Sequence, residues 1–305
     1  MNITVIGAGA VGGYFGSRLH DAGVNVTFLV RERRFNQLKE EGLTVESING
    51  DTYIKEPNIV SDVTKIEACD LVILSVKGYH MDGIYPQLKV LVKKGAKILP
   101  LLNGMEHYEL LKERFGEESV IGGLCYIVTT LDNGRIVHTS KLHDIVYGPL
   151  VEEQATFCEE LLPLFEKANM NVTLSKSILN EIWSKYAYIT AFSGITTSSR
   201  LEIGMIRDTP EALELFKELG KEMYQLAKAY GVDLGDSLVQ SFEDRAHQFP
   251  RNATSSMHQD LRKGLPLELE SLQGGAIRMG EAKGIHLDKV KVIYALLKPF
   301  EHGRN

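Results

Sequence analysis

Short runs of apolar residues, separated by segments with helical spacing, mark the first half of the chain. The runs are ITVIG (3–7), VNVTFLVR (24–31), DLVILSV (70–76), AKILPLL (96–102) and SVIGG (119–123). Near-continuous apolar runs are typical of parallel strands that are buried on both faces. Their alternation with helical segments, such as residues 10–23, predicts βαβ crossovers and a doubly wound sheet.

The pattern changes between residues 124 and 148. YIVTT, RIVHTS and DIVYG flank an Asn133–Gly134 dipeptide, which is a hairpin-turn signal. We therefore expect short antiparallel strands at the edge of the sheet. A helix over roughly residues 152–168 and a strand over 171–175 complete this half.

From Lys176 onward the spacing is helical almost throughout, and no segment predicts a strand. The change of pattern places a domain boundary near residue 175. The predicted fold is an α/β domain over residues 1–175 followed by an all-α domain over residues 176–305.

A lysine lies within the apolar pattern of the first helix of this second domain. In EIWSKYAYITAF (181–192), Lys185 shares a helix face with Ile182 and Ile189. Such a lysine commonly packs its stem on apolar surface and extends its ammonium into water. A buried, functional lysine is the alternative.

Composition and charge exclude several classes of protein. With 305 residues, 44% hydrophobic residues and a net charge of −6, the chain has no dense basic run, so we expect no nucleic-acid partner. No apolar stretch reaches the roughly 20 residues of a membrane span, and no signal peptide is recognised. The three cysteines are widely spaced and fit no zinc or disulfide pattern, which favours a reducing compartment and a cytoplasmic protein without a metal site.

The most informative local motif is GAGAVG at residues 7–12, a G-x-G-x-x-G sequence that follows a strand and opens a helix. In this context Gly7 permits the tight turn, Gly9 lets the backbone approach a pyrophosphate, and Gly12 allows close helix–strand packing. The free backbone amides of the loop and of the start of the helix, those of Ala8, Ala10 and Val11, would face the anion. The motif predicts a dinucleotide site.

The second strand ends at Arg31, where NAD sites usually carry an acidic residue for the ribose 2′-hydroxyl. A guanidinium at this point suits a 2′-phosphate by charge and by bidentate geometry. We therefore expect NADP(H) as the cofactor. The following Glu32, Arg33 and Arg34 keep open a solvated charge cluster as the alternative.

Two further polar residues follow predicted strands, Lys77 after DLVILSV and Asn103 after AKILPLL. Ligands of open α/β sheets bind beyond the carboxyl ends of the strands. Each residue is therefore a candidate contact to cofactor or substrate, with a helix cap or a turn as the alternative role.

Taken in order, these residues resemble the ketopantoate reductases (2-dehydropantoate 2-reductases) over essentially the whole chain. The resemblance rests on GAGAVG, LVR ending in Arg31, VILSVKGYH, LLNGM, EIWSKYAY and TSSMHQDLRKGLPLELESLQGG. It implies a Rossmann-like NADP-binding domain followed by an all-helical substrate and catalytic domain. It also implies reduction of 2-dehydropantoate to D-pantoate by NADPH, a step of pantothenate biosynthesis.

The resemblance assigns roles to residues of the second half. Lys185 matches the general acid, and Glu268 matches a carboxylate that positions the lysine and also reaches the cofactor. Ser256 matches a serine that binds the substrate carboxylate, and Asn103 matches an asparagine between cofactor and substrate. Without the resemblance, Glu268 would be interpreted as a solvated charge and Ser256 as a helix cap.

The match departs from the family at three positions. Ile189, Ser193 and Ala253 stand where the family commonly has asparagines that contact the substrate. Ile189 and Ser193 follow Lys185 by one and two helical turns, so we expect both to border the substrate pocket. The departures put the preferred substrate in doubt.

Three other interpretations stay open. The same chemistry could act on another branched 2-oxo acid, or the chain could be a non-catalytic NADPH-binding sensor. Hydroxyisobutyrate-type dehydrogenases also join a Rossmann domain to a helical domain with a lysine, but the S-S-M-x-Q-D segment argues against them. The expected partners are a small-molecule 2-oxo acid and, in a homodimer, a second copy of the chain.

Overall fold

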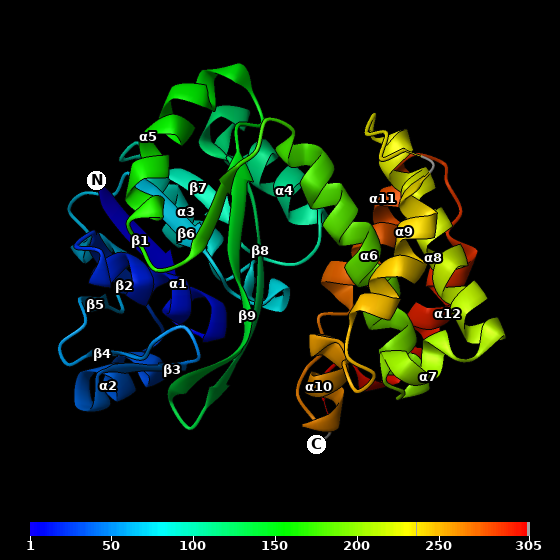
Figure 1. The fold of residues 1–305 in the computed structure, drawn as a ribbon. Helices are drawn as coiled ribbons and strands as arrows, with labels where there is room; N and C mark the ends of the chain where they lie inside the picture. The colour runs from blue at the N-terminus through cyan, green and yellow to red at the C-terminus, as the bar shows by residue number, and fades with distance from the viewer. Residues whose placement is uncertain (236, 304–305) are drawn as a thin grey trace. The chain divides into compact units, whose positions relative to one another are not determined.

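The computed structural model describes residues 1–235 and 237–303, which form two compact units (Figure 1). The first unit comprises Met1–Leu102 and Tyr108–Ile178, and the second comprises Asn103–His107 and Leu179–Asn305. The predicted boundary after residue 175 lies close to Ile178. The short segment Asn103–His107 belongs to the second unit, although it lies within the first half of the sequence.

The first unit contains a five-stranded parallel sheet in the order β5-β2-β1-β6-β7. Its strands are β1 (Asn2–Ile6), β2 (Asn25–Leu29), β5 (Ile59–Val60), β6 (Leu71–Leu74) and β7 (Lys97–Pro100). Strand β5 was not predicted, but the apolar runs that predicted the other four strands supply the core of the sheet: every residue of β6 is buried. This order, with the first strand in the middle, is that of a doubly wound dinucleotide-binding sheet.

Five helices belong wholly or mainly to this unit: α1 (Ala10–Asp21), α2 (Glu32–Glu41), α3 (Tyr85–Val92), α4 (Glu106–Phe115) and α5 (Ala155–Glu166). A 3-10 turn, η2 (Gly78–His80), follows β6. The helix predicted over residues 10–23 ends at Asp21, and Gly23 takes a φ of 81° just beyond it. A glycine with positive φ after a helix is the expected stop signal.

A second five-stranded sheet in this unit was not predicted. Its strands are β3 (Leu43–Ser47), β4 (Thr52–Ile54), β8 (Gly122–Asp132), β9 (Arg135–Gly148) and β10 (Asn171–Leu174). The expected edge strands of residues 124–148 are in fact two long strands around the Asn133–Gly134 turn. The run 119–123 is not a strand of its own, because β8 starts only at Gly122. Strand β9 pairs with β8 antiparallel and with β3 and β10 parallel, which makes it the centre of this sheet.

The second unit is helical over its described residues, as the spacing predicts. Its helices are α6 (Ile178–Ser199, which begins at the end of the first unit), α7 (Ile203–Arg207), α8 (Pro210–Ala229), α9 (Ser237–Gln248), α10 (Ser256–Arg262), α11 (Gly275–Ala282) and α12 (Asp288–Leu297). A π-helical segment, η5 (Glu270–Gly274), leads directly into α11. π-helical turns are rare and frequently occur at functional sites.

Helix α6 is buried on nearly all sides, rather than along one stripe. Trp183, Tyr186, Ala187 and Ala191 expose at most 1% of their surface. A helix that is buried on nearly all sides lies in the core of its domain. A charged side chain in the buried part of this helix is therefore an exception that calls for a partner.

Candidate functional site

In the first unit, the glycine loop connects β1 to α1. Gly7 has a φ of 98°, and a Cβ at Gly12 would lie 2.0 Å from Ser75 Oγ and 2.2 Å from the Gly7 carbonyl oxygen. Both positions therefore require glycine. Around Gly9, in contrast, a Cβ would meet no atom within 4 Å. The loop is packed tightly against its own sheet at Gly7 and Gly12 and has open space at Gly9.

The amides that follow Gly9 suit an anion. Gly9 caps α1 without a side-chain hydrogen bond, and the first helical bond runs from Gly13 N–H to the Gly9 carbonyl at 2.9 Å. The N–H groups of Ala10, Val11 and Gly12 consequently have no partner within the helix. Open space at Gly9 beside these amides fits a pyrophosphate. Ala8 itself is buried, and its carbonyl accepts a bond from Arg34 Nε at 3.1 Å.

Arg31 and Lys77 lie at the carboxyl ends of the strands on either side of β1. Arg31 follows β2, is exposed and is the N-cap residue of α2, while Lys77 follows β6 and caps η2. Since β2 and β6 both pair with β1, the structure brings these residues to the same edge of the sheet as the glycine loop. This is the edge where α/β sheets bind ligands.

Two residues at this edge were not identified as candidates from the sequence. His80 Nε2 lies 3.4 Å from Arg31 Nη1, and burial together with the Arg31 charge lowers the pKa of His80. Arg34 holds the loop between β1 and α1 through the Ala8 carbonyl, and its Nη2 is buried without a hydrogen-bond partner. Within the cluster of residues 31–34, therefore, Arg31 is exposed at the sheet edge, and Arg34 supports the glycine loop.

In the second unit, Lys185 lies in the middle of α6 and exposes only 9% of its surface. A lysine that extends into solvent keeps its ammonium hydrated, so this burial favours the functional alternative. His107, which exposes 8%, lies within the electrostatic field of Lys185. Burial, and to a lesser degree the Lys185 charge, lower the pKa of His107 to about 3, so the imidazole is neutral beside the lysine.

Glu268 exposes 5% of its surface and is therefore not the solvated charge that its residue type alone suggests. Its carbonyl accepts a bond from Leu272 N–H at 3.1 Å at the start of the π-helical segment. The neighbouring helix is attached there too, because Tyr186 Oη donates to the Leu272 carbonyl at 2.7 Å. Lys185 is thus next in sequence to Tyr186, one partner of this buried contact, and the Glu268 backbone is hydrogen-bonded to Leu272, the other partner.

The segment Asn103–His107 is attached to the same π-helical segment. Gly104 has a φ of 106°, and a Cβ there would lie 2.5 Å from the Ser271 carbonyl oxygen. The glycine of the Asn103–Gly104 pair is therefore required by close backbone contact, and Asn103 itself is half-buried. Three predicted site residues, Asn103, Lys185 and Glu268, come from distant parts of the sequence. Each is close in sequence to a residue that contacts, or belongs to, the π-helical segment.

The remaining predicted residues follow Lys185 along α6. Ile189 is half-buried and Ser193 is 4% exposed, and the spacing of four residues places both on the Lys185 face. One turn further, Thr196 Oγ1 lies 2.9 Å from Ser255 Oγ, which brings the start of α10 to this face.

The cap of α10 is Ser255, whose Oγ accepts from His258 N–H at 3.1 Å, so the helix-cap role considered for Ser256 falls one residue earlier. Ser256 is exposed and Ala253 is half-buried. A serine hydroxyl at this position is accessible to a ligand, whereas Ala253 offers only its backbone carbonyl, which accepts from Ile203 N–H at 2.9 Å.

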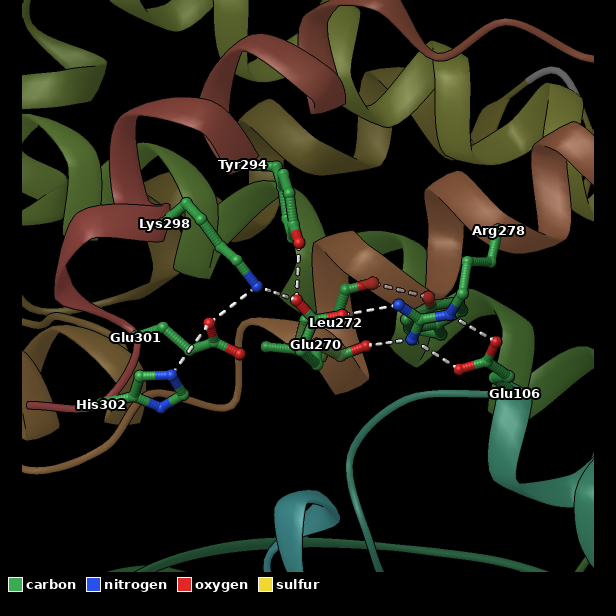
Figure 2. A network of polar contacts seen from close by, with 9 residues as sticks. Glu106, Glu270, Leu272, Arg278, Tyr294, Lys298, Glu301 and His302 are labelled. Carbon is green, nitrogen blue, oxygen red and sulfur yellow. Dashed lines mark hydrogen bonds and ion pairs between the residues drawn. The ribbon is translucent and has the colours of Figure 1, made fainter.

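An ion-pair network surrounds the π-helical segment (Figure 2). Arg278 contacts Glu106 and Glu270, while Tyr294 and Lys298 also contact Glu270. The sequence offered no signal for it, because the residues that it joins are up to 172 positions apart.

Comparison with known proteins places both units in one family. The family model "Ketopantoate reductase PanE/ApbA" matches residues 3–152, and "Ketopantoate reductase PanE/ApbA C terminal" matches residues 177–301. The chain belongs to the ketopantoate reductase family. It is an oxidoreductase with the parallel-sheet α/β domain and the helical domain of that family.

Individual relatives cover the whole length of this ketopantoate reductase family member. It is 33% identical over 302 residues to an uncharacterised oxidoreductase, YkpB, of Bacillus subtilis (strain 168), covering 99% of both chains. It is similar to the crystal structure of 2-dehydropantoate 2-reductase from Geobacter metallireducens GS-15, with a TM-score of 0.90 and 26% identity over 98% of this chain and 99% of that chain. D-mandelate dehydrogenase in a ternary structure with NADH and anilino(oxo)acetate shares the fold at 22% identity and a TM-score of 0.88, covering 99% of this chain and 98% of that chain.

Across residues 1–235 and 237–303, no helix combines the length and the apolar character that crossing a membrane requires. The same residues contain no group of three or more His, Cys, Asp or Glu side chains that could hold a metal ion.

Proposed function

We propose that this family member is an NADPH-dependent 2-oxo acid reductase that converts 2-dehydropantoate to D-pantoate. The observation that carries the proposal is the buried lysine of α6: Lys185 exposes 9% of its surface in the middle of a largely buried helix, and the buried carboxylate of Glu268 belongs to the same unit. Burial of a cation or a carboxylate costs folding free energy unless the group is paired. Such groups cluster at functional sites, where the cost is tolerated for catalysis.

Lys185 would act as the general acid. When bound, the nicotinamide supplies a hydride to the keto carbon, and the carbonyl oxygen then needs a proton and a nearby positive charge. The Lys185 ammonium provides both. Glu268 would orient the lysine and favour its charged form, whereas burial would favour the uncharged form, so the surroundings of Lys185 would tune the acid.

Arg31 supports NADPH rather than NADH. It replaces the acidic residue of an NAD site, and His80 provides a second hydrogen-bonding group 3.4 Å away. The glycine loop would hold the pyrophosphate through the amides of Ala10–Gly12, and Lys77 would contact the cofactor from the end of β6.

Asn103, Ser193 and Ser256 would bind the substrate. Asn103 offers an amide and the two serines offer hydroxyls, which suits a carboxylate and a carbonyl. The half-buried Ile189 favours a second candidate, a branched 2-oxo acid without a hydroxyl group. Both candidates share the chemistry and differ only in the side chain of the substrate.

The test is NADPH oxidation by the purified protein over a panel of 2-oxo acids that includes 2-dehydropantoate and 2-oxoisovalerate. We expect turnover with both, with 2-dehydropantoate preferred. Preference for 2-oxoisovalerate would favour the second candidate. NADPH binding without turnover of any 2-oxo acid would contradict both and favour a non-catalytic sensor.

A further inference from the structure

Arg278 of α11 engages two carboxylates from different parts of the chain (Figure 2). Its Nε and Nη2 donate to Glu106 Oε1 and Oε2 at 2.8 and 2.7 Å, a bidentate pair. Its Nη1 donates to Glu270 Oε2 at 2.5 Å, and Nη2 also donates to the Glu270 carbonyl at 2.8 Å. Because the guanidinium is planar and rigid, these four bonds fix the two glutamates relative to each other.

Both glutamates are close in sequence to predicted site residues. Glu106 is three residues beyond Asn103, and Glu270 is two residues beyond Glu268. The Asn103 segment already lies against the π-helical segment, where Gly104 packs on the Ser271 carbonyl. Arg278 adds a second attachment between these two segments.

Glu270 is itself held from its other side. Its Oε1 accepts from Tyr294 Oη at 2.6 Å and from Lys298 Nζ at 2.7 Å. Burial would raise the pKa of Glu270, but the hydrogen bonds from Lys298, Tyr294 and Arg278 outweigh it and lower the pKa to about 2. The carboxylate is therefore charged at any working pH and provides a fixed anchor for Arg278.

We propose that Arg278 is a positioning residue that, through Glu106 and Glu270, sets where Asn103 and Glu268 lie relative to Lys185. The inference rests on the proposed function, because it assumes that these three residues form the reaction site. Catalysis depends steeply on position: a displacement of about 1 Å by a remote change can cost about 100-fold in rate.

A purely structural role is the competing explanation. The Arg278 side chain is 46% exposed, and those of Glu106 and Glu270 are 26% and 35% exposed. A single ion pair with this exposure contributes little to stability, but a bidentate pair within a charge network can contribute more. The test therefore needs readouts that the loss of a surface ion pair would not change.

The experiment compares Arg278→Lys with wild type in the full chain. Lysine keeps the charge but loses the bidentate geometry. We expect kcat to fall about 10- to 100-fold, with a much smaller change in the Kd for NADPH, because the glycine loop and Arg31 are untouched. Amide hydrogen exchange should accelerate in residues 103–107 and 268–274 and stay unchanged in β1 and α1.

Two further variants make the result specific. Arg135→Lys disrupts an exposed arginine–glutamate pair in the first unit, in which Nη1 donates to Glu46 at 2.8 Å, and should change neither kcat nor this exchange. Glu106→Gln removes one carboxylate and leaves the contacts between Arg278 and Glu270. Its kcat and exchange rates should lie between those of wild type and Arg278→Lys. This variant replaces Arg278→Lys in the test if Arg278→Lys folds poorly.

Normal kcat in Arg278→Lys, or unchanged exchange in both segments, would overturn the positioning role while leaving the proposed function in place. A wild-type protein that reduces no 2-oxo acid would instead contradict the proposed function, and the positioning role for that reaction with it.

Discussion

In the first unit the candidate cofactor surface is made largely of backbone, whereas in the second unit the candidate reaction site is made of side chains. Around Gly9, amides of α1 face open space, and Gly7 and Gly12 shape the loop by lacking a Cβ. In the second unit, Lys185 and Glu268 are buried, and contacts of the π-helical segment hold their surroundings.

The difference teaches where each kind of function is encoded. A backbone surface is specified by a few adjacent residues, because local conformation is enough to aim the amides. A side-chain site needs residues that tertiary packing brings together, and each of them depends on neighbours that lock it in place. Changes in the first unit should therefore alter cofactor affinity, while changes in the second should alter turnover.

The largest expected effect is that of Lys185→Ala. Loss of the general acid should reduce kcat about 10²- to 10⁴-fold, while the Kd for NADPH stays nearly unchanged, because the lysine acts on the carbonyl oxygen. Steady-state kinetics and fluorescence titration of NADPH measure the two quantities. Lys221→Ala, which removes an exposed lysine of α8, is the control. Retention of more than about a tenth of wild-type turnover would return Lys185 to a packing role.

Arg31→Ala should produce the opposite pattern in the first unit. Removal of charge-assisted bonds to a 2′-phosphate should raise the Kd for NADPH about 10- to 100-fold and change the Kd for NADH much less. Arg33→Ala, an exposed neighbour, is the matched control. An equal loss for both cofactors would show that Arg31 does not recognise the phosphate.

A smaller effect is expected at Ile189, which tests substrate choice within the second unit. Ile189→Asn adds a hydrogen-bonding group on the Lys185 face and should raise the ratio of kcat/KM for 2-dehydropantoate over 2-oxoisovalerate about five- to tenfold. Ile189→Val keeps the position apolar and should leave the ratio unchanged. If the asparagine also leaves it unchanged, Ile189 is ordinary packing.

The last effect concerns stability and its dependence on pH, and not activity. The folded-state pKa of His107 is about 3, below the ordinary value of 6.5, because of burial and the Lys185 charge. The unfolded chain therefore binds one more proton between these values, so stability is complete above about pH 6.5 and is lost as the pH falls, by up to about 1.4 kcal/mol per pH unit.

Urea denaturation at several pH values should show a shallower loss in His107→Gln than in wild type. Identical pH dependence in the two proteins would mean that His107 is not buried in its neutral form.

The comparison also explains which features the sequence predicted. The long apolar runs of β1, β2, β6 and β7 identified the parallel sheet, because burial on both faces leaves a clear pattern. Strands β5 and β4 have only two and three residues, and β3 (LTVES) alternates apolar and polar residues instead of forming an apolar run, so none of the three was separated from loops. The hairpin turn at Asn133–Gly134 was recognised, but the pairing of β9 with β3 and β10 depends on contacts far apart in sequence.

The candidate site divides in the same way. Local sequence was enough for the glycine loop, since its conformation depends on adjacent residues. Burial of Glu268 and the ion pairs of Arg278 with Glu106 and Glu270 arise from packing between segments that are distant in the chain. Residue type alone argued for a solvated charge at Glu268. The resemblance to the family supplied the candidate roles of Lys185 and Glu268.

The measurement that tests the central claim most directly is hydride transfer itself. The purified protein is incubated with 2-dehydropantoate and NADPH that carries deuterium at both C4 positions of the dihydronicotinamide, and the product is examined by mass spectrometry and for its configuration. We predict D-pantoate that carries one deuterium at C2, formed by wild type and strongly reduced in Lys185→Ala. NADPH binding without deuterium in this product, or in the 2-hydroxy acid formed from any other 2-oxo acid of the panel, would contradict the account.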